Sequence, residues 1–103
     1  MRLSVPAARK IIRQAAADTA RVSFTLHALR RMRQRKITRR QVMQCLQQGV
    51  ITEEPAPDRH GNWACRVERL VAGDPTSVAV VIEGDGSLIV ITAFAGSDNV
   101  PLR

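Results

Sequence analysis

The sequence is short of aromatic residues, because its 103 residues include two Phe, one Trp and no Tyr. Folds that bind single-stranded nucleic acid by base stacking need several exposed rings, so this composition argues against RRM-like readers. Glycine-rich phosphate loops are also absent, which argues against a nucleotide-binding enzyme. Two cysteines are too few for a disulfide scaffold, and no apolar run approaches the ~20 residues of a membrane span.

Length and composition fit one globular domain. The chain is 45% hydrophobic and 24% charged, close to the averages for globular proteins, and its length allows one modest core. We expect a single domain over residues 1–103 with a loose tail over 96–103. Basic residues interrupt the apolar residues of the first 20 positions, so the start is not a secretory signal, and we expect a cytoplasmic protein.

Lysine is scarce as well, and the positive charge is carried by arginine and placed unevenly. The chain has 14 Arg and 2 Lys against nine acids, a net charge of +7. Residues 1–50 hold twelve basic residues and one acid, a net +11, whereas residues 51–103 hold four basic residues and eight acids, a net −4. Arginine binds phosphate or carboxylate through a planar, bidentate fork. The first half of the chain is therefore expected to attract a polyanion or an acidic partner.

Helical periodicity covers the first half of the chain. Ser4-Val5-Pro6 opens a first helix that ends near residues 18–20, and residues 21–24 read as a connector. Thr25 can cap a second helix running to about Arg35. On that helix the apolar residues form one arc. The opposite arc carries a histidine and three arginines: His27, Arg30, Arg31 and Arg35.

A third helix has the clearest start signal in the sequence. Thr38 and Gln41 fit a capping box, and Gly49 fits the left-handed position that ends many helices. Arg39 and Arg40 fall in the first turn, where the helix dipole disfavours cations by a few tenths to about 1 kcal/mol. An anionic ligand or an acidic neighbour would offset that cost.

The period changes to that of strands after Gly49. Strands are expected at Val50–Glu53, Trp63–Val71, Ser77–Glu83 and Ser87–Phe94, with Pro55 and Pro57 ending the first, turns at Arg59–Asn62 and Gly73–Pro75, and a hairpin at Gly84–Gly86. The fold class is α+β, with two to three N-terminal helices on a three- to four-stranded antiparallel sheet. The last two strands are nearly continuous apolar runs, which are usually covered on both faces. A homodimer contact through the sheet is therefore expected.

The second helix also carries a family resemblance. His27, Ala28, Arg31, Met32, Arg35 and Ile37 match a motif His-Ala-x-x-Arg-Met-x-x-Arg-x-Ile, and Ile91-Thr92-Ala93-Phe94 is similar to an Ile-Thr-x-aromatic final strand. On these residues the chain resembles domain-of-unknown-function family 4258, small bacterial proteins, over about residues 24–94. Residues 1–22 lie outside the resemblance. A glycine common before the Ile of the motif is Lys36 here, so the turn between the helices differs.

The layout of that family is similar to RelE-type and BrnT-type toxins, which implies a RelE-like fold and an RNA-engaging, toxin-type function. RNA cleavage by the 2′-hydroxyl needs a proton acceptor, a proton donor and a cation for the phosphate. The first hypothesis is thus a metal-independent endoribonuclease with His27 as acid or base and with phosphate on Arg30, Arg31, Arg35, Arg39 and Arg40. Its partners would be RNA and an acidic antitoxin-like protein, and it would need no cofactor or metal.

Each of these residues also has a structural interpretation. His27 could hydrogen-bond a strand carbonyl and fix helix to sheet, and Arg31 and Arg35 could form salt bridges with Glu53, Glu54 or Glu68. The second hypothesis is a non-catalytic module that binds nucleic acid or an acidic protein through residues 30–40. Cys45 and Cys65 are expected to be buried thiols, because no ligand spacing joins them to His27 or His60.

Overall fold

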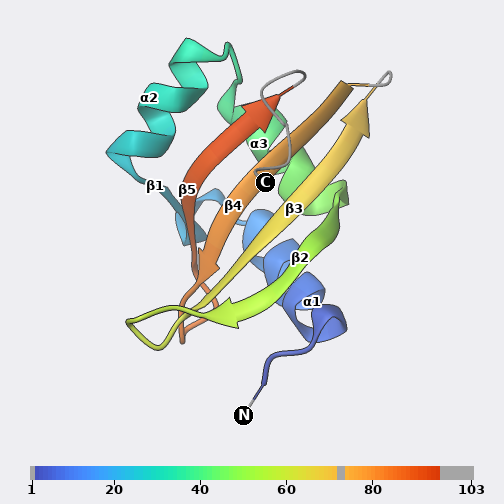
Figure 1. Ribbon diagram of the computed structural model, residues 1–103, viewed down its shortest axis with the longest axis vertical. Helices are drawn as coiled ribbons and strands as arrows, with labels where there is room; N and C mark the ends of the chain where they lie inside the picture. The colour runs from blue at the N-terminus through green and yellow to red at the C-terminus, as the bar shows by residue number, and fades with distance from the viewer. Residues whose placement is uncertain (1, 72–73, 96–103) are drawn as a thin grey trace, which may run out of the picture.

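The structure is a computed structural model that describes residues 2–71 and 74–95 (Figure 1). Along this part of the sequence, three α-helices come before all but one of the strands. The helices of this part of the chain are α1 (Val5–Ala16), α2 (Leu26–Gln34) and α3 (Arg39–Gln48), with a short 3-10 turn at Thr19–Arg21. The strands are β1 (Val22–Phe24), β2 (Val50–Pro57), β3 (Trp63–Val71), β4 (Asp74–Ile82) and β5 (Leu88–Ala95). The predicted α+β class is confirmed. The tail expected over 96–103 lies outside the described residues, as does Gly73 of the second expected turn, and Asp74 already belongs to β4.

The sheet is mixed and has five strands, in the order β1-β5-β4-β3-β2. β1 pairs with β5 in parallel, and the other three pairings are antiparallel. The prediction of a three- to four-stranded, wholly antiparallel sheet was therefore wrong. Residues 21–24, predicted as a connector, include β1, whose three residues are too few to show a strand period. Val22 in this strand is buried and lies opposite Leu88.

The first of the expected C-terminal strands is longer than its prolines suggested. β2 runs on through Pro55 to Pro57, where it still pairs with Trp63. It is one of the two edge strands of the described sheet, and a residue without an N–H group is tolerated there because one side of the strand has no neighbouring strand to pair with. The register of β2 against β3 shifts twice, between Ile51 and Glu53 and between Glu53 and Ala56. Such irregularities are typical of edge strands.

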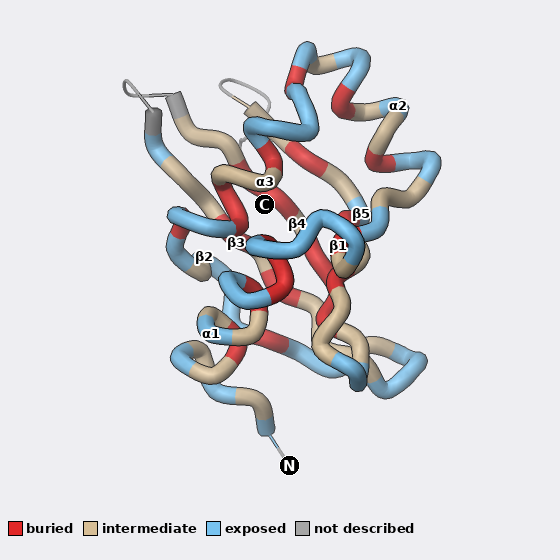
Figure 2. Tube along the Cα trace, turned by 180° about the vertical axis from the view of Figure 1, so that it is seen from behind, coloured by how far each residue is buried: buried red, intermediate tan, exposed pale blue. Residues whose placement is uncertain are grey.

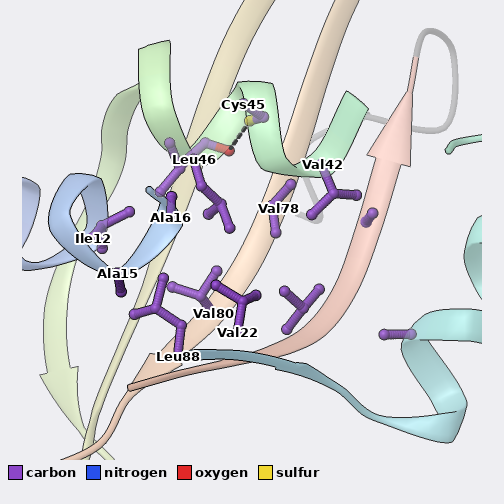
Figure 3. Close-up of a cluster of buried hydrophobic side chains, with 14 of the residues drawn as sticks. Ile12, Ala15, Ala16, Val22, Val42, Cys45, Leu46, Val78, Val80 and Leu88 are labelled. Carbon is purple, nitrogen blue, oxygen red and sulfur yellow. Dashed lines mark hydrogen bonds between the residues drawn. The ribbon is translucent and has the colours of Figure 1, made fainter. Parts of the chain in front are cut away.

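The hydrophobic core lies between the helices and one face of the sheet (Figure 3). Side chains alternate along β4, so that Val78, Val80 and Ile82 point to the core at 0–3% exposure. From the helices, Ile12, Ala15 and Ala16 of α1 and Val42, Cys45 and Leu46 of α3 fill the space opposite them. The thiol of Cys45 donates to the carbonyl oxygens of Val67 in β3 (3.5 Å) and Thr76 in β4 (3.4 Å), which connects α3 to both of these strands.

Gly49 ends α3, but in an extended conformation (φ −78°) and not in the predicted left-handed one. Its lack of a side chain serves close packing instead. A Cβ atom at this position would lie 2.5 Å from the carbonyl oxygen of Cys45 and 2.7 Å from that of Glu68. A left-handed conformation occurs instead after α2, at Lys36 (φ 56°), which directly follows the C-cap of that helix. The resembling family commonly has glycine at this position.

The helices are arranged on one side of the sheet. α1 and α3 lie behind the strands in Figure 1 and in front of them in Figure 2, which is turned by 180°. α2 continues from β1 and packs on β5. No described helix packs on the opposite face of the sheet, so within residues 2–71 and 74–95 one face of the apolar strands stays open.

Candidate nucleic-acid interface

The start of α2 is fixed to the sheet by Thr25. The backbone N–H of Thr25 donates to the carbonyl of Val90 (3.1 Å), and its hydroxyl donates to the carbonyl of Ile91 (3.3 Å). The same hydroxyl accepts a hydrogen bond from the N–H of Ala28 (2.9 Å), which confirms Thr25 as the N-cap. One threonine therefore sets both where α2 begins and how its first turn is placed against β5.

His27 lies in that first turn and is exposed. Its side chain makes no hydrogen bond, ion pair or ring contact with any residue that the structure describes. The alternative role considered for it, bonding a strand carbonyl to fix helix to sheet, is filled by Thr25 instead. His27 is available to solvent, one turn ahead of Arg31 on the same helix.

Arg30 and Arg31 follow His27 along the outer side of α2, whereas Ala28 and Met32 are buried as the apolar arc predicted. Leu26 belongs to the same arc but is 78% exposed as the first residue of the helix. Arg31 is half-buried, and its guanidinium donates to the side-chain oxygen of Gln34 (3.2 Å).

Arg35 lies apart from His27, against the sheet. Its guanidinium donates to the carbonyl of Ala93 (2.8 Å) and lies 4.7 Å from the centre of the Phe94 ring. Arg66 of β3 lies 4.9 Å from the same ring. Arg35, which the predicted arc grouped with His27, is the C-cap residue of α2 and makes these contacts with β5. The structure brings Arg35 of the helical motif into contact with Phe94 of the final-strand pattern.

The first turn of α3 presents two further arginines. Thr38 and Gln41 form the predicted capping box, with bonds of 3.0 Å and 2.7 Å. Arg39 is exposed and lies 5.1 Å from the centre of the Phe24 ring, and Arg40 is exposed beside it. The first turn of this helix contains no acid.

We call the basic side chains of α2, the following turn and the start of α3 the basic segment; its members are Arg30, Arg31, Arg33, Lys36, Arg39 and Arg40. No carboxylate of the described residues lies within 4.0 Å of any of them. The ion pair seen elsewhere, Arg66 with Glu53 (3.6 Å), belongs to the open face of the sheet. The predicted salt bridge from Arg31 to Glu53, Glu54 or Glu68 is absent from the described part of the chain.

Charge in the basic segment is therefore not matched locally. α2 and α3 contain no Asp or Glu, and the described acids of the second half lie on β2, β3 and β4 and in the turns between strands. Uncompensated guanidinium groups on neighbouring helices favour bidentate contacts with an external anion. The first hypothesis from the sequence marked Arg30, Arg31, Arg35, Arg39 and Arg40 for this role, and the range 30–40 of the second hypothesis also covers Arg33 and Lys36.

The remaining candidates for a reactive or metal-binding site are less favourable. Burial raises the pKa of Cys45 to about 12 and that of Cys65 to about 11, so both thiols stay protonated at neutral pH. Among the residues that the structure describes, no group of three His, Cys, Asp or Glu side chains could hold a metal ion. None of the described helices is long and apolar enough to cross a membrane.

Comparison with known proteins gives a family match. The family described as Domain of unknown function (DUF4258) matches residues 24–95. The match begins in β1 and ends with β5, so it includes the basic segment and the Arg35–Phe94 contact and leaves out α1. No curated protein and no solved structure matches the chain.

Proposed function

The chain belongs to the DUF4258 family, a domain of unknown function, and we propose from its own geometry that it binds RNA through the basic segment. The observation that carries the proposal is the set of guanidinium groups on α2 and α3 with no carboxylate of the described residues within 4.0 Å. The resemblance in layout to RelE-type toxins favours RNA among the polyanions. An acidic protein partner of the antitoxin kind would use the same groups and compete with RNA.

Salt dependence tests this proposal, because phosphate contacts release counterions on binding. The binding of a labelled single-stranded RNA would be followed by fluorescence anisotropy at several salt concentrations. Arg40→Gln is expected to weaken binding and to make its salt dependence shallower. The matched control is Arg59→Gln, which removes an exposed arginine from the turn after β2, outside the basic segment. Equal effects of the two changes would contradict the proposal.

A second function, RNA cleavage, is favoured by the position of His27. Its exposed imidazole stands one turn ahead of Arg31, so a phosphate held by Arg31 would bring the neighbouring ribose within reach of His27. In such a reaction the 2′-oxygen bonds to phosphorus and the bond to the 5′-oxygen breaks. His27 would take the 2′-hydroxyl proton as base while water protonates the leaving 5′-oxygen, or would protonate that oxygen as acid while water takes the 2′-hydroxyl proton. Arg31 would stabilise the added phosphate charge.

The two functions separate in one pair of variants. For cleavage, His27→Ala is expected to abolish RNA cutting and any growth inhibition on expression, while RNA binding persists. His27→Gln keeps a hydrogen-bonding side chain and serves as the control for shape. If the wild-type chain neither cuts RNA nor slows growth, the cleavage hypothesis fails and the binding proposal is unaffected.

A further inference from the structure

Arg39 differs from the other described members of the basic segment because an aromatic ring lies beneath its side chain. Its guanidinium carbon is 5.1 Å from the centre of the Phe24 ring, so the cation stands over the face of that ring. Phe24 is the last residue of β1, and Arg39 is the first residue of α3. The contact therefore joins the start of α3 to the point where β1 continues into α2 (Figure 1).

The ring of Phe24 is supported by the fold. Phe24 lies two positions after Val22 on β1, so both side chains point to the same side of the sheet, where Val22 is buried. Phe24 is half-buried and packs against the hydrophobic core, and its backbone lies opposite Val90 of β5. The guanidinium of Arg39 thus has a fixed, flat surface under it.

The guanidinium of Arg39 is exposed, and no hydrogen bond or ion pair with a described residue occupies it. The two arginines over the other phenylalanine ring differ in this respect. Arg35 donates to the carbonyl of Ala93 (2.8 Å). Arg66 forms an ion pair with Glu53 (3.6 Å). Those two guanidinium groups belong to the internal contacts of the sheet, whereas the outer side of Arg39 faces solvent.

The position of Arg39 has an electrostatic cost that its own helix does not offset. It falls in the first turn of α3, where the helix dipole disfavours a cation, and this turn contains no acid. An apolar side chain could cover Phe24 without that cost. A ligand on the outer side of the guanidinium accounts for an arginine at this position.

The chemistry of the guanidinium group suits a nucleotide. The group is planar and delocalised, so it stacks on flat rings through its faces while its N–H groups donate in its own plane. One face of Arg39 is turned to Phe24. The other face can receive a nucleobase, and the N–H groups at the edge can bind a phosphate of the same strand. Bases inside a duplex are stacked on one another and cannot make this contact.

From this geometry we propose that Arg39, supported by Phe24, stacks on one unpaired base of the bound RNA and so selects single-stranded RNA. The inference rests on the proposed RNA binding by the basic segment and adds a base contact to the phosphate contacts. Phe24 is a positioning residue, because it acts through Arg39. The shortage of aromatic residues fits this arrangement, since one guanidinium over one ring provides a single stacking position and not an extended platform.

The test compares the affinities of the full chain for two labelled strands of equal length, measured by fluorescence anisotropy at one salt concentration. One strand is oligouridylate RNA, and the other is an abasic strand with the same ribose-phosphate chain and no bases. The ratio of the two affinities isolates the contribution of the bases from that of the phosphates. The wild type is expected to bind oligouridylate about twofold to fivefold more tightly, as for a cation over a ring at an exposed site.

Two substitutions assign this ratio to the stacked pair. Arg39→Lys keeps the positive charge and replaces the planar group by a compact ammonium, so it is expected to bring the ratio close to one. Phe24→Leu keeps every charge and is expected to lower the ratio as well, with circular dichroism as the check on folding. The matched control is Arg59→Lys, at an exposed arginine outside the basic segment, which is expected to keep the wild-type ratio.

The outcomes separate the stacking from the proposed RNA binding. Equal affinity of the wild type for the two strands, or a wild-type ratio in Arg39→Lys or in a folded Phe24→Leu variant, overturns the stacking and leaves RNA binding in place. A wild type that binds neither strand overturns RNA binding, and the stacking with it. Arg39 is exposed, so its lysine variant decides the question even where Phe24→Leu unfolds the chain.

Discussion

Replacing Gly49 by alanine is the sharpest test of how α3 is seated on the sheet. The added Cβ would stand 2.5 Å from the carbonyl oxygen of Cys45, 2.7 Å from that of Glu68 and 2.8 Å from a methyl group of Val67. Two of these three atoms belong to the backbone, so no side-chain rotation relieves the overlap. The end of α3 must move away from β3.

Two effects set the change in the free energy of unfolding: the overlap in the folded protein and the entropy of the unfolded chain. Overpacking in a well-packed interior typically costs about 1–3 kcal/mol, and a backbone overlap with two carbonyl groups belongs at the upper end of that range. Alanine also reduces the entropy of the unfolded chain, which returns about 0.4–1 kcal/mol. The expected net loss is about 2 kcal/mol, equivalent to a fall in Tm of roughly 8–16 °C for a domain of this size.

Thermal unfolding followed by circular dichroism measures this loss, with urea unfolding as a check on the free energy. The matched control is Gly84→Ala, because a Cβ at Gly84 would meet nothing within 4 Å and its φ is not in the left-handed region. That control is expected to leave the Tm unchanged or slightly raised. A Gly49→Ala variant as stable as Gly84→Ala would refute the close approach of α3 to β3.

Two further substitutions and two measurements on the cysteines test other parts of the fold. Lys36→Gly is expected to raise the free energy of unfolding by about 0.5–1 kcal/mol. A left-handed lysine costs ~1–2 kcal/mol, and glycine returns part of this gain because it increases the entropy of the unfolded chain. A lower Tm would contradict the left-handed conformation of Lys36. Arg35→Ala is expected to lower stability by about 2 kcal/mol through its lost carbonyl bond and ring contact, measured by urea unfolding, and a neutral result would mean that α2 is not fixed to β5 by this side chain. Cys45 and Cys65, with pKa values raised to about 12 and 11, are expected to react slowly with a thiol reagent at pH 8 until denaturant is added. Their raised values contribute stability that is present below about pH 8.5 and is lost as the pH rises toward 11–12, so thermal unfolding between pH 8 and 11 should show a falling Tm.

Local signals in the sequence were sufficient for the helices. Thr25, Thr38 and Gln41 cap as their positions predicted, because capping depends on residues three positions apart. The predicted arc of α2 is likewise confirmed at Ala28 and Met32, since burial on an amphipathic helix follows its period. The resemblance to the DUF4258 family over residues 24–94 is confirmed by the match over 24–95.

Features that depend on distant parts of the chain could not be predicted in this way. β1 is a strand only because β5, more than 60 residues later, offers it a parallel edge. Arg35 was placed correctly near the end of α2, but its partners Ala93 and Phe94 come from that same distant strand. Gly49 was assigned a local, left-handed role, whereas the constraint on it comes from the backbone of β3.

The same distinction between local and distant contacts applies to the candidate site. The sequence located the arginines of the basic segment and His27, since helix spacing fixes which side they share. It left open whether those arginines pair with the protein's own carboxylates, because that depends on where β2 and β3 lie. Within the described residues the strands place Glu53 beside Arg66 and leave Arg30 and Arg31 without a carboxylate partner.

The role of the basic segment is tested best by the salt dependence of RNA binding. The measurement compares the wild type with a variant carrying Arg30→Gln, Arg31→Gln, Arg39→Gln and Arg40→Gln, using a labelled single-stranded RNA across a range of salt concentrations. Each phosphate contact on a single strand contributes about −0.7 to the slope of log K against log salt concentration. The variant is expected to bind more weakly, with a slope that is shallower by up to about 3. An unchanged affinity and slope, or a wild type that binds no RNA at low salt, would contradict it.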